Sequence, residues 1–84
     1  MLAIVGISIE PAKLEDVSKQ LSLLSPITEL YKGRGDSNMY AIVSVPGVQE
    51  LHDFLQNQVL RISAIKGTIT SVLLHSYKGP RANR

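Results

Sequence analysis

Two kinds of apolar repeat alternate along this chain of 84 residues, and their order limits the fold more than any other feature. Residues 2–9, LAIVGISI, repeat with period two and are rich in β-branched side chains, which predicts a strand. Pro11 then suits the first turn of a helix. From Leu14 to Leu24 the apolar residues are spaced three and four apart, which predicts one helical stripe ending at Ser25-Pro26.

The same order returns in the second half of the chain. Residues 27–32 predict a second strand, the turn formers of residues 33–38 (GRGDSN) predict a hairpin loop, and residues 39–45 (MYAIVSV) predict a third strand. After Gly67, residues 68–77 predict a last strand. Between the third and last strands a second helix is expected from about residue 48, with one apolar stripe formed by Val48, Leu51, Leu55, Val59 and Ile62.

The resulting order, βαββαβ, predicts an α+β fold of the ferredoxin-like plait type. Such a fold is a four-stranded antiparallel sheet with two helices on one face. We expect one domain over residues 1–78 and a basic, flexible tail over residues 79–84. The first and last strands carry apolar residues on both faces, so the face without helices would be an exposed apolar patch. This predicts a dimer in which two sheets pack face to face; a monomer with a modest apolar face is the alternative.

The small size of the chain also favours self-association. A domain of this length buries a limited core and usually needs disulfides, a metal or a partner. The sequence has no cysteine, and His52 and His75 are its only histidines, so neither a disulfide nor a structural zinc site is expected. We expect no cofactor and no bound metal. Association with further copies is the support that remains.

The basic charge of the chain is concentrated at its end. Lys78, Arg81 and Arg84 lie in the last seven residues, which contain no acid, and the rest has six basic and seven acidic residues. A nucleic-acid-binding fold would carry a basic stripe on its folded part, so direct DNA binding is not expected. There is no signal peptide and no apolar run long enough for a membrane span, so a cytoplasmic protein without membrane contact is expected.

No group of residues predicts catalysis. His52 is expected at the flank of the second helix and His75 on the last strand, and neither belongs to a known catalytic spacing. The best candidate for a binding site is the hairpin loop. Backbone N–H groups of a glycine-rich turn can receive a carboxylate, and Asp36, Ser37 and Asn38 offer acceptors for an ammonium group. The loop therefore suits a zwitterionic amino acid.

The sequence resembles the effector-binding (RAM) domain of the Lrp/AsnC family of transcriptional regulators. The likeness runs from about residue 3 to residue 78 and is carried by GISIEPAKLEDV, LYKGRGDSNMYAIVSV and ELHDFLQNQVLRISAIKGTITSVLLHSYK. It implies dimers built by sheet packing and a ring of dimers, an octamer or decamer, with amino-acid effectors bound in clefts between dimers. By this resemblance the effector contacts would be Gly35, Asp36, Ser37, Asn38 and Met39 of one dimer, with Thr68, Thr70 and Ser71 of its neighbour.

The chain departs from the family pattern at several places. Asn38 stands where the family usually has aspartate, and Ser63-Ala64-Ile65 replaces Pro-Gly-Val. The family's helix-turn-helix domain does not precede the first strand, so we expect a module that does not read DNA itself. Such a module would sense amino acids, or would join full-length Lrp/AsnC-family regulators through a shared interface.

Three classes of function stay open at this point. The resemblance and the loop favour a non-catalytic, oligomeric ligand-sensing module. A structural or protein-interaction module without a small ligand would have side chains filling the cleft between dimers. A small dimeric α/β-barrel enzyme would need His75 to line an enclosed pocket.

Overall fold

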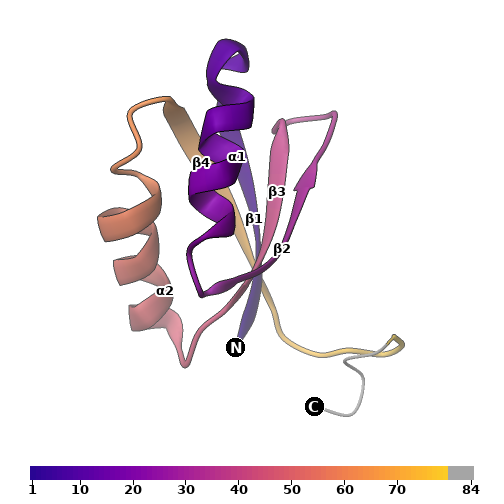
Figure 1. The fold of residues 1–84 in the computed structure, drawn as a ribbon. Helices are drawn as coiled ribbons and strands as arrows, with labels where there is room; N and C mark the ends of the chain where they lie inside the picture. The colour runs from indigo at the N-terminus through magenta and orange to yellow at the C-terminus, as the bar shows by residue number, and fades with distance from the viewer. Residues whose placement is uncertain (80–84) are drawn as a thin grey trace.

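The computed structural model describes residues 1–79 and has the predicted order of elements. Both helices, α1 (Leu14–Ser22) and α2 (Val48–Phe54), lie on one face of a single sheet (Figure 1). The sheet is antiparallel with the order β2-β3-β1-β4, and its strands are β1 (Leu2–Ile9), β2 (Ile27–Lys32), β3 (Met39–Ser44) and β4 (Ile65–Leu73). This is the predicted α+β ferredoxin-like fold.

The core lies between the sheet and the helices and is almost entirely aliphatic. Its centre is the ladder between β1 and β3, where Val5 faces Ala41 and each is fully buried. Burying one Val or Leu side chain stabilises the fold by about 1.5–3 kcal/mol. The buried apolar residues are Ala3, Val5, Ile7, Ile9, Leu14, Val17, Leu21, Met39, Ala41, Val43, Val45, Leu51, Phe54, Val59 and Ile65.

The first helix follows the predicted pattern closely. Pro11 opens a single 3-10 turn before α1, where its missing N–H leaves no hydrogen bond unmade. Glu15 and Asp16 lie in the first turn of α1, where negative charge favours the helix dipole. The helix ends at Ser22, slightly before the predicted Ser25-Pro26, and the Ser22 hydroxyl donates to the Lys19 carbonyl at 2.8 Å.

The second helix differs from its prediction because its last turn is wide. After α2, residues 55–59 form a π turn in which the Leu60 N–H donates to the Leu55 carbonyl, five residues earlier, at 2.8 Å. The wide turn shifts the phase of the apolar stripe, so that Phe54 and Val59 are both buried. Val48 was predicted to belong to the stripe, which is wrong, because 69% of it is exposed.

The last strand also differs, in both of its bounds. It was predicted over residues 68–77, but β4 runs from Ile65 to Leu73. At its start, Ile65 pairs with Ile9 past a bulge at Lys66 of β4, so Gly67 lies inside the strand and not before it. At its end, Leu73 pairs with Leu2, the first residue of β1, and no strand residue remains to pair with residues 74–77. Propensity alone extended the prediction too far. The predicted tail, residues 79–84, lies outside the described residues except for Gly79.

The face of the sheet without helices is apolar at its centre. Ile4 on β1 lies opposite Ile42 on β3, and Leu2 lies opposite Leu73 on β4. Ile69 lies nearby on β4, opposite Gly6. Ile4 is 36% exposed, Leu73 42% and Ile69 62%, whereas the residues on the helix-covered face of β1 are buried. We call Leu2, Ile4, Ile42, Ile69 and Leu73 the open face.

Candidate functional site

The hairpin loop between β2 and β3, residues 33–38, forms a closed turn. The Gly33 N–H donates to the Asn38 carbonyl at 3.1 Å, which holds the two ends of the loop together. Gly35 has a φ of +155°, a conformation that residues with a side chain rarely adopt, so glycine is required there. Arg34 and Asp36 are exposed. The loop backbone is fixed within one chain while its charged side chains stay accessible.

Tyr40 of β3 supports this loop from the sheet. Its hydroxyl accepts a hydrogen bond from the Ser37 N–H at 3.1 Å. A Cβ added to Gly33 would lie 2.6 Å from the Tyr40 ring, and a Cβ added to Gly6 would lie 2.6 Å from the Ser37 Oγ. These approaches are closer than a side chain allows. Two glycines, one in the loop and one in β1, therefore let Ser37 and Tyr40 pack on the sheet.

The sequence analysis did not identify Tyr40 or Gly6 as residues that build the site. One signal was available for Gly6, because a glycine inside a strand often marks the close approach of another segment. Tyr40 carried a weaker signal: it is out of phase with the buried residues Met39 and Ala41, so it had to lie on the other face of the sheet. Only the folded loop shows that the two residues meet at Ser37.

Asn38 ties the loop to β1. Its Oδ1 accepts a hydrogen bond from the Ile9 N–H at 2.9 Å, and its Nδ2 donates to the Ile9 carbonyl at 2.7 Å. The side-chain amide thus takes the place of a paired residue at the end of the ladder between β1 and β3. An aspartate in the same place would set a second oxygen against the Ile9 carbonyl. The predicted acceptor for an ammonium group already has a partner inside the chain.

The residues predicted from the last strand lie across β1 from the loop. Thr68 pairs with Ile7, and Met39 pairs with Ile7 from the other side. Neighbouring strands are about 5 Å apart, so β3 and β4 are separated by about 10 Å at this level. Thr68 and Thr70 share the face of Ile7 and Val5, which the helices cover, whereas Ser71 lies opposite Ile4 on the other face.

Within one chain the eight predicted contact residues therefore form two groups that do not meet. Ser37 and Asn38 are engaged by the chain's own Tyr40 and Ile9, and Met39 is buried in the core at 3% exposure. Over residues 1–79, the side chains of Asp36, Thr68, Thr70 and Ser71 make no hydrogen bond. Their role in binding an effector stays a prediction.

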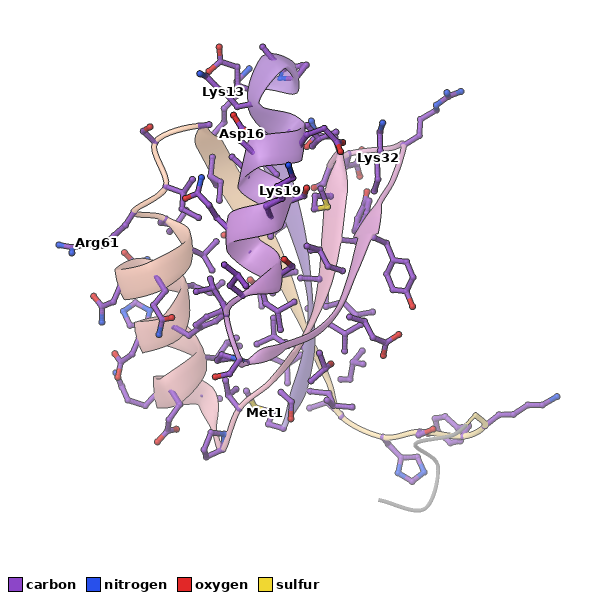
Figure 2. All side chains as sticks on the ribbon, in the orientation of Figure 1. Met1, Lys13, Asp16, Lys19, Lys32 and Arg61 are labelled. Atoms are coloured by element: carbon purple, nitrogen blue, oxygen red, sulfur yellow. The ribbon has the colours of Figure 1, made fainter. Side chains whose placement is uncertain are left out.

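A groove lies at another place, between α1 and the connection from α2 to β4. It has a volume of about 500 Å³. Val17 and Ile62 line its apolar part, while Asp16, Lys13 and Arg61 bring charges of both signs, and Figure 2 shows Lys13 and Asp16 together near the start of α1. All three of these charged residues are exposed. The groove and the hairpin loop are separate features.

The histidines lie outside both features. His52 is exposed on α2, as expected, and His75 lies beyond β4, where its ring contacts the Tyr77 ring edge-on with centroids 4.6 Å apart. Neither lines the groove. Within residues 1–79, no three His, Cys, Asp or Glu side chains are clustered as a metal ion would require. None of the helices in this range is long and apolar enough to cross a membrane.

Comparison with known sequences identifies close likenesses over nearly the whole chain. The model of the family described as the Lrp/AsnC ligand binding domain matches residues 2–82. An uncharacterized HTH-type transcriptional regulator of Pyrococcus furiosus is 30% identical over 73 residues, which are 87% of this chain and 49% of that protein. The chain spans about half the length of the curated relatives it matches.

Solved structures show the same fold. AsnC of Escherichia coli superposes with a TM-score of 0.89 at 22% identity, over 93% of this chain and 53% of that one. A transcriptional regulator of Neisseria meningitidis in complex with L-Met superposes with a TM-score of 0.87 at 13% identity, over 96% of this chain and 54% of that one. At these identities the likeness is one of fold. The resemblance found in the sequence and the predicted fold are both confirmed.

Proposed function

Since the chain belongs to the family of Lrp/AsnC ligand binding domains, we propose that it is a non-catalytic, oligomeric module that senses a small amino-acid-like effector. The family match over residues 2–82 is the observation that carries this proposal. The regulator of Neisseria meningitidis with the same fold is in complex with L-Met, which supports an amino acid as the class of effector. The relatives are transcriptional regulators, which supports a regulatory and not a catalytic role.

We place the effector at the hairpin loop, with the roles of the loop residues revised by their geometry. Asp36 is exposed and makes no hydrogen bond within residues 1–79, so its carboxylate is available for an ammonium group. Asn38 cannot take this role while both ends of its amide bond Ile9. Backbone N–H groups around Gly35 are suited to the effector's carboxylate.

The second half of the site would come from another copy of the chain. The hydroxyls of Thr68 and Thr70 are unbonded within residues 1–79, but β1 separates them from the chain's own loop by about 10 Å in all. A small zwitterion does not bridge this distance with its charged groups. A neighbouring dimer that brings its own Thr68 and Thr70 to the loop would complete the site, and a ring of dimers, an octamer or decamer, would repeat it.

The open face supports the dimer that such an assembly needs. Ile4, Ile69 and Leu73 are exposed next to one another on a sheet whose helices lie on the other face. Contiguous apolar patches of this kind usually mark an interface. Two sheets packed face to face would remove them from water, and their side chains would form a second core about 10 Å thick.

Sedimentation velocity of the purified protein, alone and with each of the twenty amino acids at millimolar concentration, tests this function. We expect an assembly of several dimers whose mass or stability changes with one amino acid or a few similar ones. A stable monomer at micromolar concentration would contradict the oligomer and the shared site together. An assembly that is indifferent to every amino acid would contradict the sensor.

Three substitutions then locate the effector. Asp36→Asn and Thr70→Val should each weaken the response to the active amino acid by about tenfold or more, because each removes a polar contact to the effector. Asp16→Asn is the matched control, since it removes the same charge from the groove beside α1. A response lost in Asp16→Asn and kept in Asp36→Asn would move the effector to the groove.

A second candidate is a protein-interaction module without a small ligand. It is favoured by the hydrogen bonds that Ser37 and Asn38 make inside their own chain, because these leave fewer groups for a ligand. Such a module would join full-length regulators of the family, since an interface between like chains also fits a homologous partner. Co-migration with a full-length relative from the same cell, unchanged by amino acids, is the result expected of this candidate.

A further inference from the structure

Residues 74–79 form an arm that leaves the body of the protein. After β4 the chain turns away from the sheet and from both helices (Figure 1). Leu74 and Tyr77 are each 92% exposed, the highest values among the large apolar residues of the chain. The interactions of the arm are local: the Ser76 hydroxyl donates to the Lys78 carbonyl, and the His75 ring contacts the Tyr77 ring. Within residues 1–79 the arm makes no hydrogen bond to the sheet or the helices.

Within residues 1–79 the arm has no partner in the sheet. Continuing β4 past Leu73 would require a residue of β1 before Leu2. Met1 is turned toward the other neighbour: its ammonium group donates to the Val45 carbonyl at 2.8 Å, and the Val45 N–H donates to the Met1 carbonyl at 3.0 Å. Met1 is therefore bonded on the β3 side, and within residues 1–79 no residue of the sheet pairs with the arm.

The arm and the open face are two exposed apolar surfaces of one chain, and they adjoin in the sequence. Leu73 belongs to the open face and Leu74 is the first residue of the arm. Four extended residues span about 13 Å, and three gaps between four strands span about 14 Å. The segment from Leu74 to Tyr77 is thus long enough to reach across most of a four-stranded sheet.

We propose that Leu74 and Tyr77 of each copy pack against the open face of a second copy, beside the contact between the two sheets. The inference rests on the dimer proposed above, and it adds the arms to an interface that would otherwise consist of the two sheets alone. Arm and open face occur on the same chain, so a two-fold axis lets each copy give its arm and receive the other. Tyr and Leu bury large apolar areas, and a Tyr hydroxyl can stay hydrated at the rim.

The experiment compares dimer affinity in three variants by sedimentation equilibrium. The double variant Leu74→Ser/Tyr77→Ser should raise the dimer dissociation constant by about tenfold or more, because buried interface anchors dominate affinity. Leu23→Ser is the matched control: Leu23 is 84% exposed, follows α1 and should leave the constant unchanged. Ile4→Lys places a charge on the open face and should abolish the dimer by itself. Circular dichroism confirms that each variant is folded.

A second readout follows the arm directly. The sequence has no cysteine, so Tyr77→Cys introduces a single thiol. Its reaction with a thiol reagent should be at least about tenfold slower in the concentrated dimer than in the diluted monomer. A dimer with unchanged affinity in the arm variant and a thiol that reacts equally fast in both states would overturn the inference and leave the sheet dimer standing. A wild-type chain that stays monomeric would overturn the sheet dimer itself.

Discussion

The hairpin loop and the arm both leave the sheet at the end of a strand, but only the loop is fastened to its own chain. Four hydrogen bonds hold the loop. The Gly33 N–H bonds the Asn38 carbonyl, and the Ser37 N–H bonds the Tyr40 hydroxyl. The Asn38 side chain makes two bonds to the backbone of Ile9, 29 residues away in the sequence. Within residues 1–79 the arm's hydrogen bond and ring contact both join residues of the arm itself. The loop is therefore a surface prepared before any partner arrives, whereas the arm needs a partner to acquire contacts.

The largest effect on stability is expected when the loop is forced off the sheet. Gly6→Val would place a side chain where the Ser37 Oγ now lies, 2.6 Å from the new Cβ. We expect the free energy of unfolding to fall by about 3 kcal/mol, because overpacking a tight contact displaces the backbone. Urea unfolding followed by circular dichroism measures it. Gly67→Ala is the control, since its Cβ would meet no atom within 4 Å. Equal losses in both variants would mean that the loop does not press on Gly6.

A smaller loss is expected when the loop keeps its place but loses its tie to β1. Asn38→Ala leaves the Ile9 N–H and carbonyl without their partners and should cost about 2 kcal/mol. Asn38→Asp should also be less stable than the wild type, because the carboxylate meets the Ile9 carbonyl at 2.7 Å. Asp36→Asn, at an exposed position of the same loop, serves as the control. A stabilised Asn38→Asp protein would show that the amide does not donate to Ile9.

The hydrogen bond between the Ser37 N–H and the Tyr40 hydroxyl should contribute less to stability than the tie of Asn38 to β1. Tyr40→Phe removes the oxygen that accepts from the Ser37 N–H and should cost about 1 kcal/mol. Tyr31→Phe is the matched control on β2, where the hydroxyl donates to the Glu29 carboxylate at an exposed position, and a change below about 0.5 kcal/mol is expected. Urea unfolding curves measure which variant loses more stability. Hydrogen exchange of the Ser37 amide should become faster only in Tyr40→Phe.

The arm should show no effect on the stability of a single chain. Leu74→Ser/Tyr77→Ser, unfolded at a concentration where the protein is monomeric, should match the wild type within about 0.5 kcal/mol, because both side chains are already exposed. The difference should grow as the protein concentration rises and the arm finds a second copy. A loss at the lowest concentration would mean that the arm packs on its own chain, and the contrast with the loop would vanish.

Much of the fold could be predicted from the sequence because strands and the first helix depend on local periodicity. The strand of residues 2–9 and the stripe of Leu14, Val17 and Leu21 came from spacing alone. The end of β4 could not be predicted, since Leu73 is the last strand residue only because β1 begins at Leu2. Phe54 was missed because a π turn shifts the phase of the helix. In the site, the turn formers located the loop, but not the hydrogen bonds of its side chains and backbone. Asn38 bonds Ile9, which is 29 residues away in the sequence, and Ser37 bonds the Tyr40 hydroxyl only because the loop folds back onto the sheet.

The pair of hydrogen bonds between Asn38 and Ile9 has a consequence for how the chain chooses one structure over its near alternatives. A slip of two residues between β1 and β3 would keep Val5 and Ala41 on the buried face, so the apolar alternation of the strands resists it only weakly. The amide of Asn38 meets both backbone groups of Ile9 only when Met39 stands opposite Ile7. Asn38 therefore stabilises one register of the two central strands, and it disfavours the shifted registers that a purely apolar pattern would tolerate.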